Sequence, residues 1–320
     1  MEKKMVSIIT PCYNGGKLLS RYLDSVLKQT YKNIELIIVN DGSSDNTEKI
    51  VISYKGQFKK EGMKLVYIYQ DNKGLGGAIN TGLKHFTGDY LCWADYDDFF
   101  RDDSVEKRVN FLENNPQYGC VTSDANVYNE DDLENPIYKI TDKFKYNEDE
   151  YQFEHHLKSE SIFCCGCHMV RTEAFLDVNP DRDIFEGRRG QNWQMLLPVY
   201  YKYKRGFLDE PLYNYIIYQH SMSNGDNTKE KYIQRYNEHL EIIKNTLQRI
   251  DMEEDERKKY LDIFLTIYIR DRFDIGLKYD DFGDAFKYYI KIVKRGDLRK
   301  YDTKSVVKLL LKRVFRIRRK

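Results

Sequence analysis

Short apolar runs alternate with stretches of helical spacing along the first hundred residues. Residues 5–10 and 34–40 are β-branched runs, ended by Pro11 and by the turn that begins at Asp41. Between the two runs, apolar residues recur at helical spacing at Leu18, Leu19, Tyr22, Leu23, Val26 and Leu27. This pattern predicts two buried parallel strands joined by a helix, because parallel strands require a crossover connection.

The same alternation continues further along the chain. Residues 65–69 and 90–93 are typical of strands, and residues 45–54 and 76–85 of helices. Four strands that alternate with three helices predict the opening of a doubly wound sheet, in which ligands bind outside the carboxyl ends of the strands. We therefore expect functional residues in the loops after Thr10, Val39, Tyr69 and Trp93.

The remainder of the chain is less regular. The pattern predicts helices at 102–114 and 192–201, a strand around 120–123, a strand interrupted by Gly166 at 162–170, and a strand pair around Glu210-Pro211 at 207–218. Residues 126–154 show no clear period, whereas residues 227–276 favour helix because they contain long runs free of Gly and Pro. We expect an α/β domain over residues 1–225 and a mainly helical extension over residues 226–320.

Residues 304–320 form a basic amphipathic pattern, with eight Lys or Arg and no acid. One helical face would carry Val306, Val307, Leu310, Val314 and Ile317, and the opposite face Lys308, Lys312, Arg316 and Lys320. Such a helix can lie on an anionic membrane surface. It can equally dock on its own protein, or on a partner subunit in a homo-oligomer, with the basic face in solvent.

Composition narrows the class of protein. The 320 residues include 52 Lys plus Arg and 51 Asp plus Glu, so the chain lacks the positive field of a protein that binds nucleic acid. No apolar run reaches the length of about 18 residues that a membrane span needs, and no export signal is recognisable. We expect a cytoplasmic location, with at most peripheral contact at the inner face of the membrane.

The six cysteines agree with a reducing compartment, because three of them lie inside apolar runs where a thiol behaves as a small hydrophobe. The other three occur in the cluster Cys164-Cys165-Gly166-Cys167-His168. A zinc site is one interpretation of this cluster. Its spacing lacks two separate Cys-x-x-Cys pairs, which favours a structural role.

Three carboxylates follow the strand at 90–93 within four residues, at Asp95, Asp97 and Asp98. Concentrated negative charge at the end of a buried strand is costly without a cation. Mg²⁺ and Mn²⁺ take oxygen ligands and commonly bridge a carboxylate to substrate phosphates. The motif therefore favours a site for a diphosphate and a metal, with a solvated acidic turn as the alternative.

The loops after the other three strands also carry polar groups. Asn40 to Asp45 offer a carboxylate and hydroxyls suited to a base or ribose, and Thr10 to Gly16 offer a hydroxyl and a ring. Lys73-Gly74-Leu75-Gly76-Gly77 is rich in Gly but has neither Rossmann nor Walker spacing. Each loop alone has an ordinary interpretation as a turn or a helix cap, but four such loops at successive strand ends predict one shared site.

These segments together resemble the family-2 glycosyltransferases of GT-A fold. The resemblance is carried by residues 6–14, residues 35–45, Asn72-Lys73-Gly74 with Asn80-Thr81-Gly82, and Gly88-Asp89-Tyr90 leading to the acidic motif. It is strong over about the first 110 residues and patchy to about residue 225. It implies a Rossmann-like, mostly parallel sheet flanked by helices, with a nucleotide-binding half at about 1–110 and an acceptor-side half at about 111–225.

The resemblance also implies roles for individual residues. Thr10, Pro11, Tyr13 and Asp41 would hold the nucleobase, most often uracil. Further donor contacts would come from the same loops at Asn14, Ser43, Lys73, Gly74, Asp95 and Tyr96. Asp95 would meet the ribose or a phosphate, Asp97 would ligate the metal, and Asp98 would support the motif. His220 matches a late His that contacts the metal or pyrophosphate in many relatives.

Two positions depart from the family pattern. Ile79 stands where relatives usually carry an Arg, so Lys73 or another residue would replace that donor contact. Asn192 stands where inverting members use an Asp as general base, and an amide cannot accept the proton. The nearest carboxylates are Asp183 and Glu186, which are also typical of solvated loop charges. Acceptor contacts would then fall to Asn192 with Gln191 and Trp193.

The implied reaction moves a hexose or N-acetylhexosamine from a UDP-sugar to a hydroxyl of a glycan, glycolipid or glycoprotein acceptor, with inversion and with Mn²⁺ or Mg²⁺. Two alternatives remain. A nucleotidyltransferase would share the sheet and the metal, but it would ordinarily show a basic Gly-rich loop after the first strand, where this chain has Pro11-Cys12-Tyr13-Asn14. A catalytically silent, nucleotide-sugar-binding scaffold subunit is suggested by Asn192.

Overall fold

The computed structural model of the protein describes residues 4–219 and 227–317. The chain forms two compact units. The first comprises Met1–Gln219 with Arg249–Asp251, and the second comprises His220–Gln248 with Met252–Lys320.

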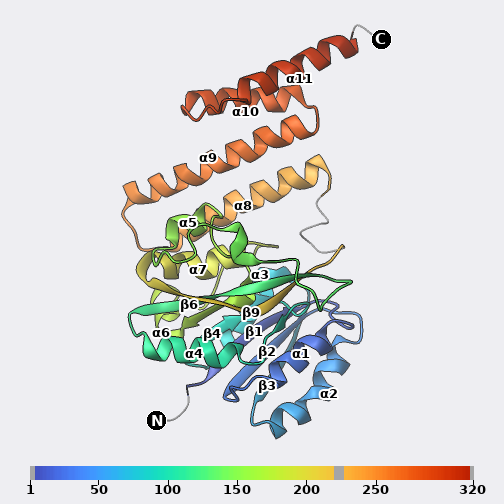
Figure 1. Ribbon diagram of the computed structural model, residues 1–320, viewed down its shortest axis with the longest axis vertical. Helices are drawn as coiled ribbons and strands as arrows, with labels where there is room; N and C mark the ends of the chain where they lie inside the picture. The colour runs from blue at the N-terminus through green and yellow to red at the C-terminus, as the bar shows by residue number, and fades with distance from the viewer. Residues whose placement is uncertain (1–3, 220–226, 318–320) are drawn as a thin grey trace. The chain divides into compact units, whose positions relative to one another are not determined.

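The first unit is built on a nine-stranded sheet with the order β3-β2-β1-β4-β8-β6-β9-β5, and β7 pairs with β6. Figure 1 shows β1 to β4 side by side in this sheet. Its parallel part contains β1 (Val6–Cys12), β2 (Ile34–Asp41), β3 (Lys64–Gln70) and β4 (Tyr90–Trp93). The four strands expected in this region are confirmed. Every residue of β1, β2 and β4 is buried, which explains their nearly continuous apolar sequences.

Helices connect these strands as the spacing of apolar residues predicts. They are α1 (Leu19–Leu27), α2 (Thr47–Lys60), α3 (Gly74–His85) and, after β4, α4 (Ser104–Asn114). In α1 the buried residues include Leu19, Tyr22, Leu23 and Val26. The helical spacing noted in the sequence is therefore the face that packs against the sheet.

The second half of the sheet contains both parallel and antiparallel pairs. β8 (His168–Arg171) runs antiparallel to both β4 and β6 (Tyr118–Asn129), whereas β9 (Lys204–Ile217) runs parallel to β6. The short strands β5 (Phe99–Phe100) and β7 (Tyr138–Lys139) pair antiparallel with β9 and β6.

The strand pair expected at 207–218 is wrong, because these residues belong to the single strand β9. The register between β6 and β9 shifts next to Asp124, which pairs with Pro211. A bulge of this kind bends a strand and accommodates a Pro that cannot donate a hydrogen bond. Glu210-Pro211 therefore marks a bend within one strand and not a turn between two.

The strand expected at 162–170 is also shorter than its sequence suggests. Cys165–Cys167 forms the 3₁₀ turn η2, and strand pairing begins only at His168. A Cβ at Gly166 would lie 2.1 Å from the ring of Tyr213, so only Gly fits this turn. The carbonyl of Gly166 accepts a hydrogen bond of 2.8 Å from Nη1 of the buried Arg108. Packing against β9 and α4 therefore imposes a 3₁₀ turn where the apolar sequence predicts a strand.

The rest of the first unit holds short elements that the sequence did not define. The aperiodic stretch contains the 3₁₀ turn η1 (Ile140–Lys143) and ends at α5 (Phe153–Leu157). Helix α6 (Thr172–Val178) follows β8, and α7 (Gln191–Lys202) confirms the helix expected at 192–201.

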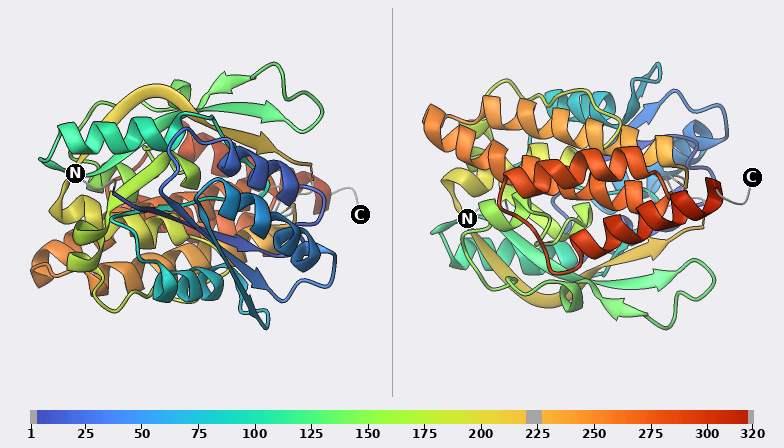
Figure 2. Two further views of the ribbon diagram at one scale, coloured as in Figure 1. Left: turned by 90° about the horizontal axis from the view of Figure 1, so that it is seen from below. Right: turned by 90° about the horizontal axis from the view of Figure 1, so that it is seen from above.

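The second unit consists of helices: α8 (Lys229–Arg249, of which Arg249 belongs to the first unit), α9 (Glu254–Lys278), α10 (Phe282–Lys294) and α11 (Asp302–Ile317). The helical stretch expected at 227–276 is confirmed but is interrupted between α8 and α9. Helix α10 lies in the extension expected to be mainly helical, but its own bounds were not predicted. Viewed from above, α10 and α11 lie next to each other (Figure 2, right). None of the helices in the described ranges is long and apolar enough to cross a membrane.

Candidate functional site

The carboxyl ends of β1 to β4 lie at one edge of the sheet, because these strands are parallel and paired in register. Cys12 is opposite Asn40, Asp41 is opposite Gln70, and Ile9 is opposite Trp93. The four loops that the sequence singled out therefore meet at this edge, as expected.

Side chains join the first two of these loops. The backbone N–H of Asn14 donates to Ser43 Oγ at 2.9 Å, and the backbone N–H of Ser44 donates to Asn14 Oδ1 at 2.9 Å. Asn14 has a φ of 52°, a left-handed conformation that Asn tolerates better than most residues. The reciprocal bonds explain why Asn14 and Ser43 occur together: each holds the other loop in place.

Asp41 joins the second loop to the third. Its Oδ1 accepts hydrogen bonds from the backbone N–H of Lys73 at 2.8 Å and from Gln70 Nε2 at 2.7 Å. Gly74, the next residue after Lys73, has a φ of 75°, which Gly adopts without steric cost because it lacks a Cβ. Asp41 is buried, with 4% of its surface exposed, and the contact to a nucleobase expected for it stays a prediction.

The first loop presents Tyr13 at its surface and keeps Thr10 and Pro11 beneath it. Thr10 and Pro11 are buried, and the Thr10 hydroxyl is hydrogen-bonded to that of Tyr22 in α1. Tyr13 is 50% exposed, and its carbonyl accepts a hydrogen bond of 2.9 Å from the Tyr96 hydroxyl. Among these residues it is therefore Tyr13 that offers a ring to a ligand.

Asp95, Asp97 and Asp98 bring their carboxylates together after β4. One oxygen of each lies within 4.8 Å of the others, and among residues 4–219 and 227–317 this is the one group of three or more His, Cys, Asp or Glu so arranged. Asp98 is 1% exposed, and its Oδ1 accepts a hydrogen bond of 2.8 Å from the backbone N–H of Ile216. No hydrogen bond from the described residues reaches its Oδ2.

Burial and mutual repulsion make this cluster reluctant to hold three negative charges. Desolvation, followed by the charge of Asp95, raises the pKa of Asp97 to about 7. Desolvation raises the pKa of Asp95, and together with the charges of Asp97 and Asp95 it raises that of Asp98 well above its usual value. A divalent cation would relieve this repulsion, so the donor set fits a hard metal ion.

Arg21 is a residue of this site that sequence reasoning missed. Its Nη2 donates to the backbone carbonyl of Asp97 and, at 2.6 Å, to the hydroxyl of Tyr218. The Tyr218 hydroxyl in turn donates to the same carbonyl at 2.9 Å. Arg21 lies on the polar side of α1, where nothing in the sequence distinguishes it from a solvated Arg.

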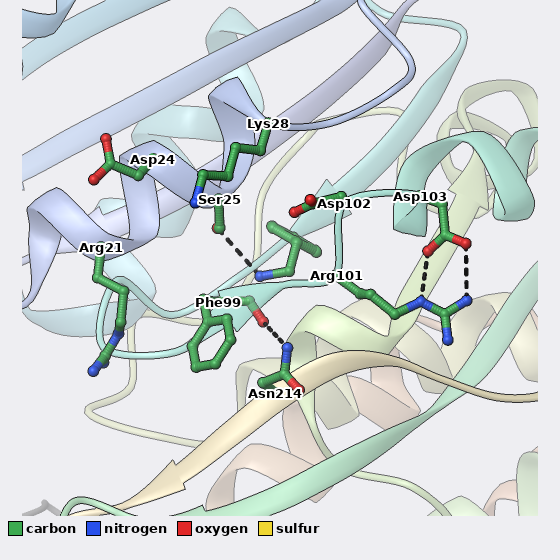
Figure 3. Close-up of a pocket in the computed structure, with 10 residues that line it drawn as sticks. Arg21, Asp24, Ser25, Lys28, Phe99, Arg101, Asp102, Asp103 and Asn214 are labelled. Carbon is green, nitrogen blue, oxygen red and sulfur yellow. Dashed lines mark hydrogen bonds and ion pairs between the residues drawn. The ribbon is translucent and has the colours of Figure 1, made fainter. Parts of the chain in front are cut away.

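A pocket that shares Arg21 with this site lies at α1, β5 and β9 (Figure 3). It is lined by Arg21, Asp24, Ser25, Lys28, Phe99, Phe100, Arg101, Asp102, Asp103 and Asn214. None of these is a residue expected to bind the donor, so this pocket does not coincide with the candidate site.

Asn192 and Trp193, at the start of α7, point into the protein. Asn192 is 9% exposed; its Oδ1 accepts a hydrogen bond of 2.7 Å from Trp93 Nε1, and its Nδ2 donates to the Phe163 carbonyl. Trp193 is 6% exposed and donates from Nε1 to the His156 carbonyl at 3.0 Å. This differs from the expected apolar wall for an acceptor, since the indole is packed in the core. Gln191 is partly exposed.

The two candidate bases lie on one loop, which packs against α3. Asn80 holds this loop by accepting from the backbone N–H of Ile184 at 2.7 Å and donating to its carbonyl at 2.9 Å. Asp183 is ion-paired with Arg249, with Oδ1 and Nη1 2.5 Å apart. Glu186 is exposed.

Close packing places Glu186 beside the Gly-rich third loop. The backbone N–H of Gly76 donates to the Gly187 carbonyl at 3.0 Å. A Cβ at Gly76 would lie 3.1 Å from the Cα of Glu186. Of the two candidates, the structure therefore sets Glu186 next to the loops at the edge of the sheet.

Two other expectations concern residues away from this edge. His220 lies outside the described residues. Cys164, Cys165 and Cys167 are buried thiols, and His168 bonds to Thr122, with Nδ1 and Oγ1 3.0 Å apart. This cluster is part of the packing between η2, β8 and β6.

Comparison with known proteins identifies the family. The profile of glycosyl transferase family 2 matches residues 7–178, more than half of the chain. The chain belongs to this family. The resemblance seen in the sequence is thereby confirmed.

Curated relatives match different lengths of this family-2 chain. An uncharacterized glycosyltransferase of Rickettsia typhi is 45% identical over 108 residues, which cover 34% of this chain and 32% of that protein. The putative glycosyltransferase EpsE of Bacillus subtilis is 30% identical over 210 residues, which cover 65% of this chain and 71% of EpsE. The chain thus spans only about a third of the length of the Rickettsia relative.

Solved structures share the fold of this family-2 chain. Residues 1–349 of S. aureus TarS in complex with UDP-GlcNAc match 92% of this chain and 93% of that one, with 17% identity and a TM-score of 0.62. The mannosyltransferase PcManGT of Pyrobaculum calidifontis, in complex with GDP-Man and Mn²⁺, matches 99% and 81%, with 15% identity and a TM-score of 0.58. The expected α/β sheet with a helical C-terminal region is confirmed.

Proposed function

We propose that this protein is a metal-dependent glycosyltransferase that moves a hexose or N-acetylhexosamine from a UDP-sugar to a hydroxyl of a glycan, glycolipid or glycoprotein acceptor, with inversion. The observation that carries the proposal is the carboxylate cluster of Asp95, Asp97 and Asp98, which lies at the edge where the loops after β1, β2 and β3 meet. Family membership, and the UDP-GlcNAc held by the structural relative TarS, support this choice of donor.

Asp97 would ligate Mn²⁺ or Mg²⁺, Asp95 would face the ribose or a phosphate, and Asp98 would anchor the motif to β9. The roles of Asp95 and Asp97 fit their position at the cluster, and that of Asp98 fits its bond to the backbone of Ile216. When bound, the metal would stabilise the charge that grows on the departing diphosphate. His220 remains a proposed second ligand.

The nucleoside would lie across the first three loops. Tyr13 would stack on the uracil ring, and Asp41 with the loop of Lys73 and Gly74 would face its polar edge and the phosphates. Thr10 and Pro11 would support the loop from beneath, while Asn14 and Ser43 would hold its shape. Tyr96 would fix Tyr13 through its hydrogen bond to the Tyr13 carbonyl.

Glu186 would serve as the general base. In the reaction the acceptor oxygen attacks the anomeric carbon, the bond from that carbon to the phosphate oxygen breaks, and UDP leaves with the bonding electrons. The hydroxyl proton passes to the carboxylate. Glu186 suits this role better than Asp183, whose carboxylate is paired with Arg249, or Asn192, whose amide is bonded to Trp93 and Phe163. Gln191 would contact the acceptor.

Thermal stabilisation by nucleotide sugars tests the donor site. We expect UDP-sugars with Mn²⁺ to stabilise the protein more than GDP- or dTDP-sugars, and Asp97→Ala to abolish that stabilisation. UDP release on a panel of hydroxyl acceptors then tests turnover. Glu186→Gln should lower kcat by about 10²-fold or more without changing stabilisation by UDP, whereas Asp183→Asn should leave kcat nearly unchanged.

A second candidate function is a catalytically silent scaffold subunit that binds a nucleotide sugar. The observation that favours it is the buried Asn192 where a base is expected. Stabilisation by UDP-sugars with no UDP release on any acceptor would support the scaffold. If Mn²⁺ and UDP stabilised Asp97→Ala as strongly as the wild type, the proposed role of Asp97 as a metal ligand would be excluded for either function.

A further inference from the structure

Helices α10 and α11 of the second unit form an antiparallel pair. The Tyr289 hydroxyl, in the second half of α10, lies 2.8 Å from that of Thr303, at the start of α11. Arg313, late in α11, lies over the ring of Phe282, at the start of α10. Both helices pack inward with a common core that includes Phe273 of α9.

Each helix carries a second apolar stripe that this packing does not cover. In α10 the buried residues are Ala285, Tyr288 and Ile292, yet Phe286, Ile290 and Val293 are 43%, 37% and 45% exposed. Each exposed residue follows a buried one by one or two positions. The exposed stripe is therefore rotated from the buried stripe by roughly 100° around the helix axis.

Helix α11 repeats the arrangement. Val306 and Leu309 are buried, whereas Val307, Leu310, Leu311 and Val314 are 38 to 49% exposed. The apolar face expected from the sequence is thus divided: Val306 docks on the protein, and the residues that follow it remain at the surface. The side chain of Ile317 lies outside the described residues.

The two exposed stripes face the same way. Both are rotated in the same sense from the side that packs on α9. The two helices run in opposite directions. Seen from one end of the pair, the step from the buried to the exposed stripe is therefore clockwise in one helix and anticlockwise in the other. Each stripe therefore turns past the contact between Tyr289 and Thr303 and out onto the side away from α9. We call this surface the outer face of the α10–α11 pair.

Lysines border the outer face on both edges. In five places an exposed apolar residue is followed directly by Lys, at Phe286-Lys287, Ile290-Lys291, Val293-Lys294, Val307-Lys308 and Leu311-Lys312. All five Lys are exposed. Each Lys is one residue further along the helix than an exposed apolar residue, so it lies at the edge of the apolar stripe. From there its long side chain can reach a polar region beside an apolar one.

Asp280, just before α10, is ion-paired with Lys312 of the rim at 2.9 Å, and the acids within residues 282–314 are ion-paired with arginines of α9. Residues 282–314 contain ten Lys or Arg and three Asp. Asp297 and Asp302 are ion-paired with Arg270 of α9, each at 2.7 Å, and Asp284 with Arg272 at 3.3 Å. The outer face is therefore apolar at its centre and positive at its rim.

We propose that the outer face of the α10–α11 pair docks on an anionic membrane surface, with the apolar stripes in the acyl boundary and the lysines at the phosphates of the headgroups. An apolar stripe with a basic border is the arrangement by which helices lie in the plane of such a surface. A second copy of this chain is a poorer occupant, because two positive rims would repel each other. The proposal does not depend on the proposed enzymatic function.

Cosedimentation of the full chain with vesicles tests the proposal. We expect binding to phosphatidylcholine vesicles that contain phosphatidylglycerol, little binding to pure phosphatidylcholine, and weaker binding at high salt. Lys291→Glu with Lys308→Glu should weaken binding at least roughly 30-fold, because the loss of each Lys costs about 1 kcal/mol near such a surface and each Glu adds repulsion. Ile290→Ser with Leu310→Ser should weaken it at least about tenfold, through the loss of apolar area.

The matched control is Lys55→Glu with Lys59→Glu on α2 of the first unit, which changes the net charge equally and should bind like the wild type. All variants alter exposed side chains, so we expect them to fold. Thermal melting at the temperature of the wild type would verify this. Equal binding to both vesicle types, or binding that neither outer-face variant weakens, would overturn the proposal. So would a dimer in sedimentation equilibrium that Ile290→Ser with Leu310→Ser dissociates, since a second copy would then cover the face.

Discussion

The indole Nε1 of Trp93 donates a hydrogen bond of 2.7 Å to Oδ1 of Asn192, 99 residues further along the chain. Trp93 is the last residue of β4, directly before the acidic motif, and Asn192 lies in the first turn of α7. The amide also donates to the Phe163 carbonyl. Asn192 therefore connects the end of β4 to the start of α7 and to the segment that contains Phe163.

This relationship predicts that Asn192 is needed for stability. Asn192→Ala should lower the free energy of unfolding by about 2–4 kcal/mol, because it leaves a buried indole N–H and a partly buried carbonyl without their present partner. Asn192→Asp should also destabilise, since a carboxylate cannot donate to Phe163, and it should not raise turnover. Gln191→Ala, at the partly exposed neighbour, is the control in urea denaturation. Equal stability of Asn192→Ala and Gln191→Ala would contradict this role.

The acidic cluster predicts a conflict between stability and metal binding. The folded pKa of Asp97 is about 7, above its ordinary value of 3.8, so the folded state holds more protons than the unfolded state between these pH values. The free energy of unfolding of the metal-free protein then falls as pH rises across that window. Asp97→Asn should therefore stabilise the metal-free protein at about pH 8, on the order of 1–2 kcal/mol, and less at about pH 5.

Thermal melting with EDTA and with Mn²⁺ measures both effects. The wild type should gain stability from Mn²⁺, and Asp97→Asn should lose that gain. Asp102→Asn, at an exposed carboxylate, is the control and should retain it. If Mn²⁺ stabilised Asp97→Asn as strongly as the wild type, Asp97 would not be a ligand.

Gly166 predicts a steric effect at the turn that precedes β8. Gly166→Ala should destabilise by about 2 kcal/mol or more, because the new Cβ would lie 2.1 Å from the ring of the buried Tyr213. The control is Gly56→Ala in α2, where no atom lies within 4 Å of the new Cβ, and it should stabilise by about 0.5–1 kcal/mol. Urea denaturation of the two variants should give changes of opposite sign, and equal changes would refute the packing argument.

His156 predicts a loss of stability in mild acid. Burial lowers its pKa from 6.5 to about 3, so between these values the unfolded state binds the extra proton and stability falls as pH decreases below about 6.5. At about pH 5.5 this histidine should cost about 1.2 kcal/mol relative to about pH 7. We expect the wild type to be more stable than His156→Gln at neutral pH. Its advantage in unfolding free energy should decrease by the same amount when the pH is lowered to about 5.5.

The exposed His85→Gln provides the control for loss of an imidazole. His168, whose pKa is also lowered by burial, acts in the same direction and remains in both proteins. A difference between wild type and His156→Gln that did not change with pH would show that His156 is not held neutral.

The sequence alone determined the parallel half of the sheet and the edge at which the candidate site lies. Strands β1, β2 and β4 are buried on both faces and therefore form continuous apolar runs, and the intervening helices repeat apolar residues at their own period. These signals are local. Parallel strands place their carboxyl ends together, so the loops that contain Tyr13, Asp41, Lys73 and Asp97 could be assigned to one edge without coordinates.

Only the tertiary structure decided the features that depend on distant partners. The bend at Pro211 requires the register with Asp124 of β6, and the burial of Asn192 and Trp193 requires β4 and α5 beside α7. Likewise, the amphipathic pattern of α11 could not show that Val306 docks inward while Val307 stays exposed, because that division depends on where α9 and α10 lie. Side-chain periodicity identifies a face, whereas packing against other elements determines what covers it.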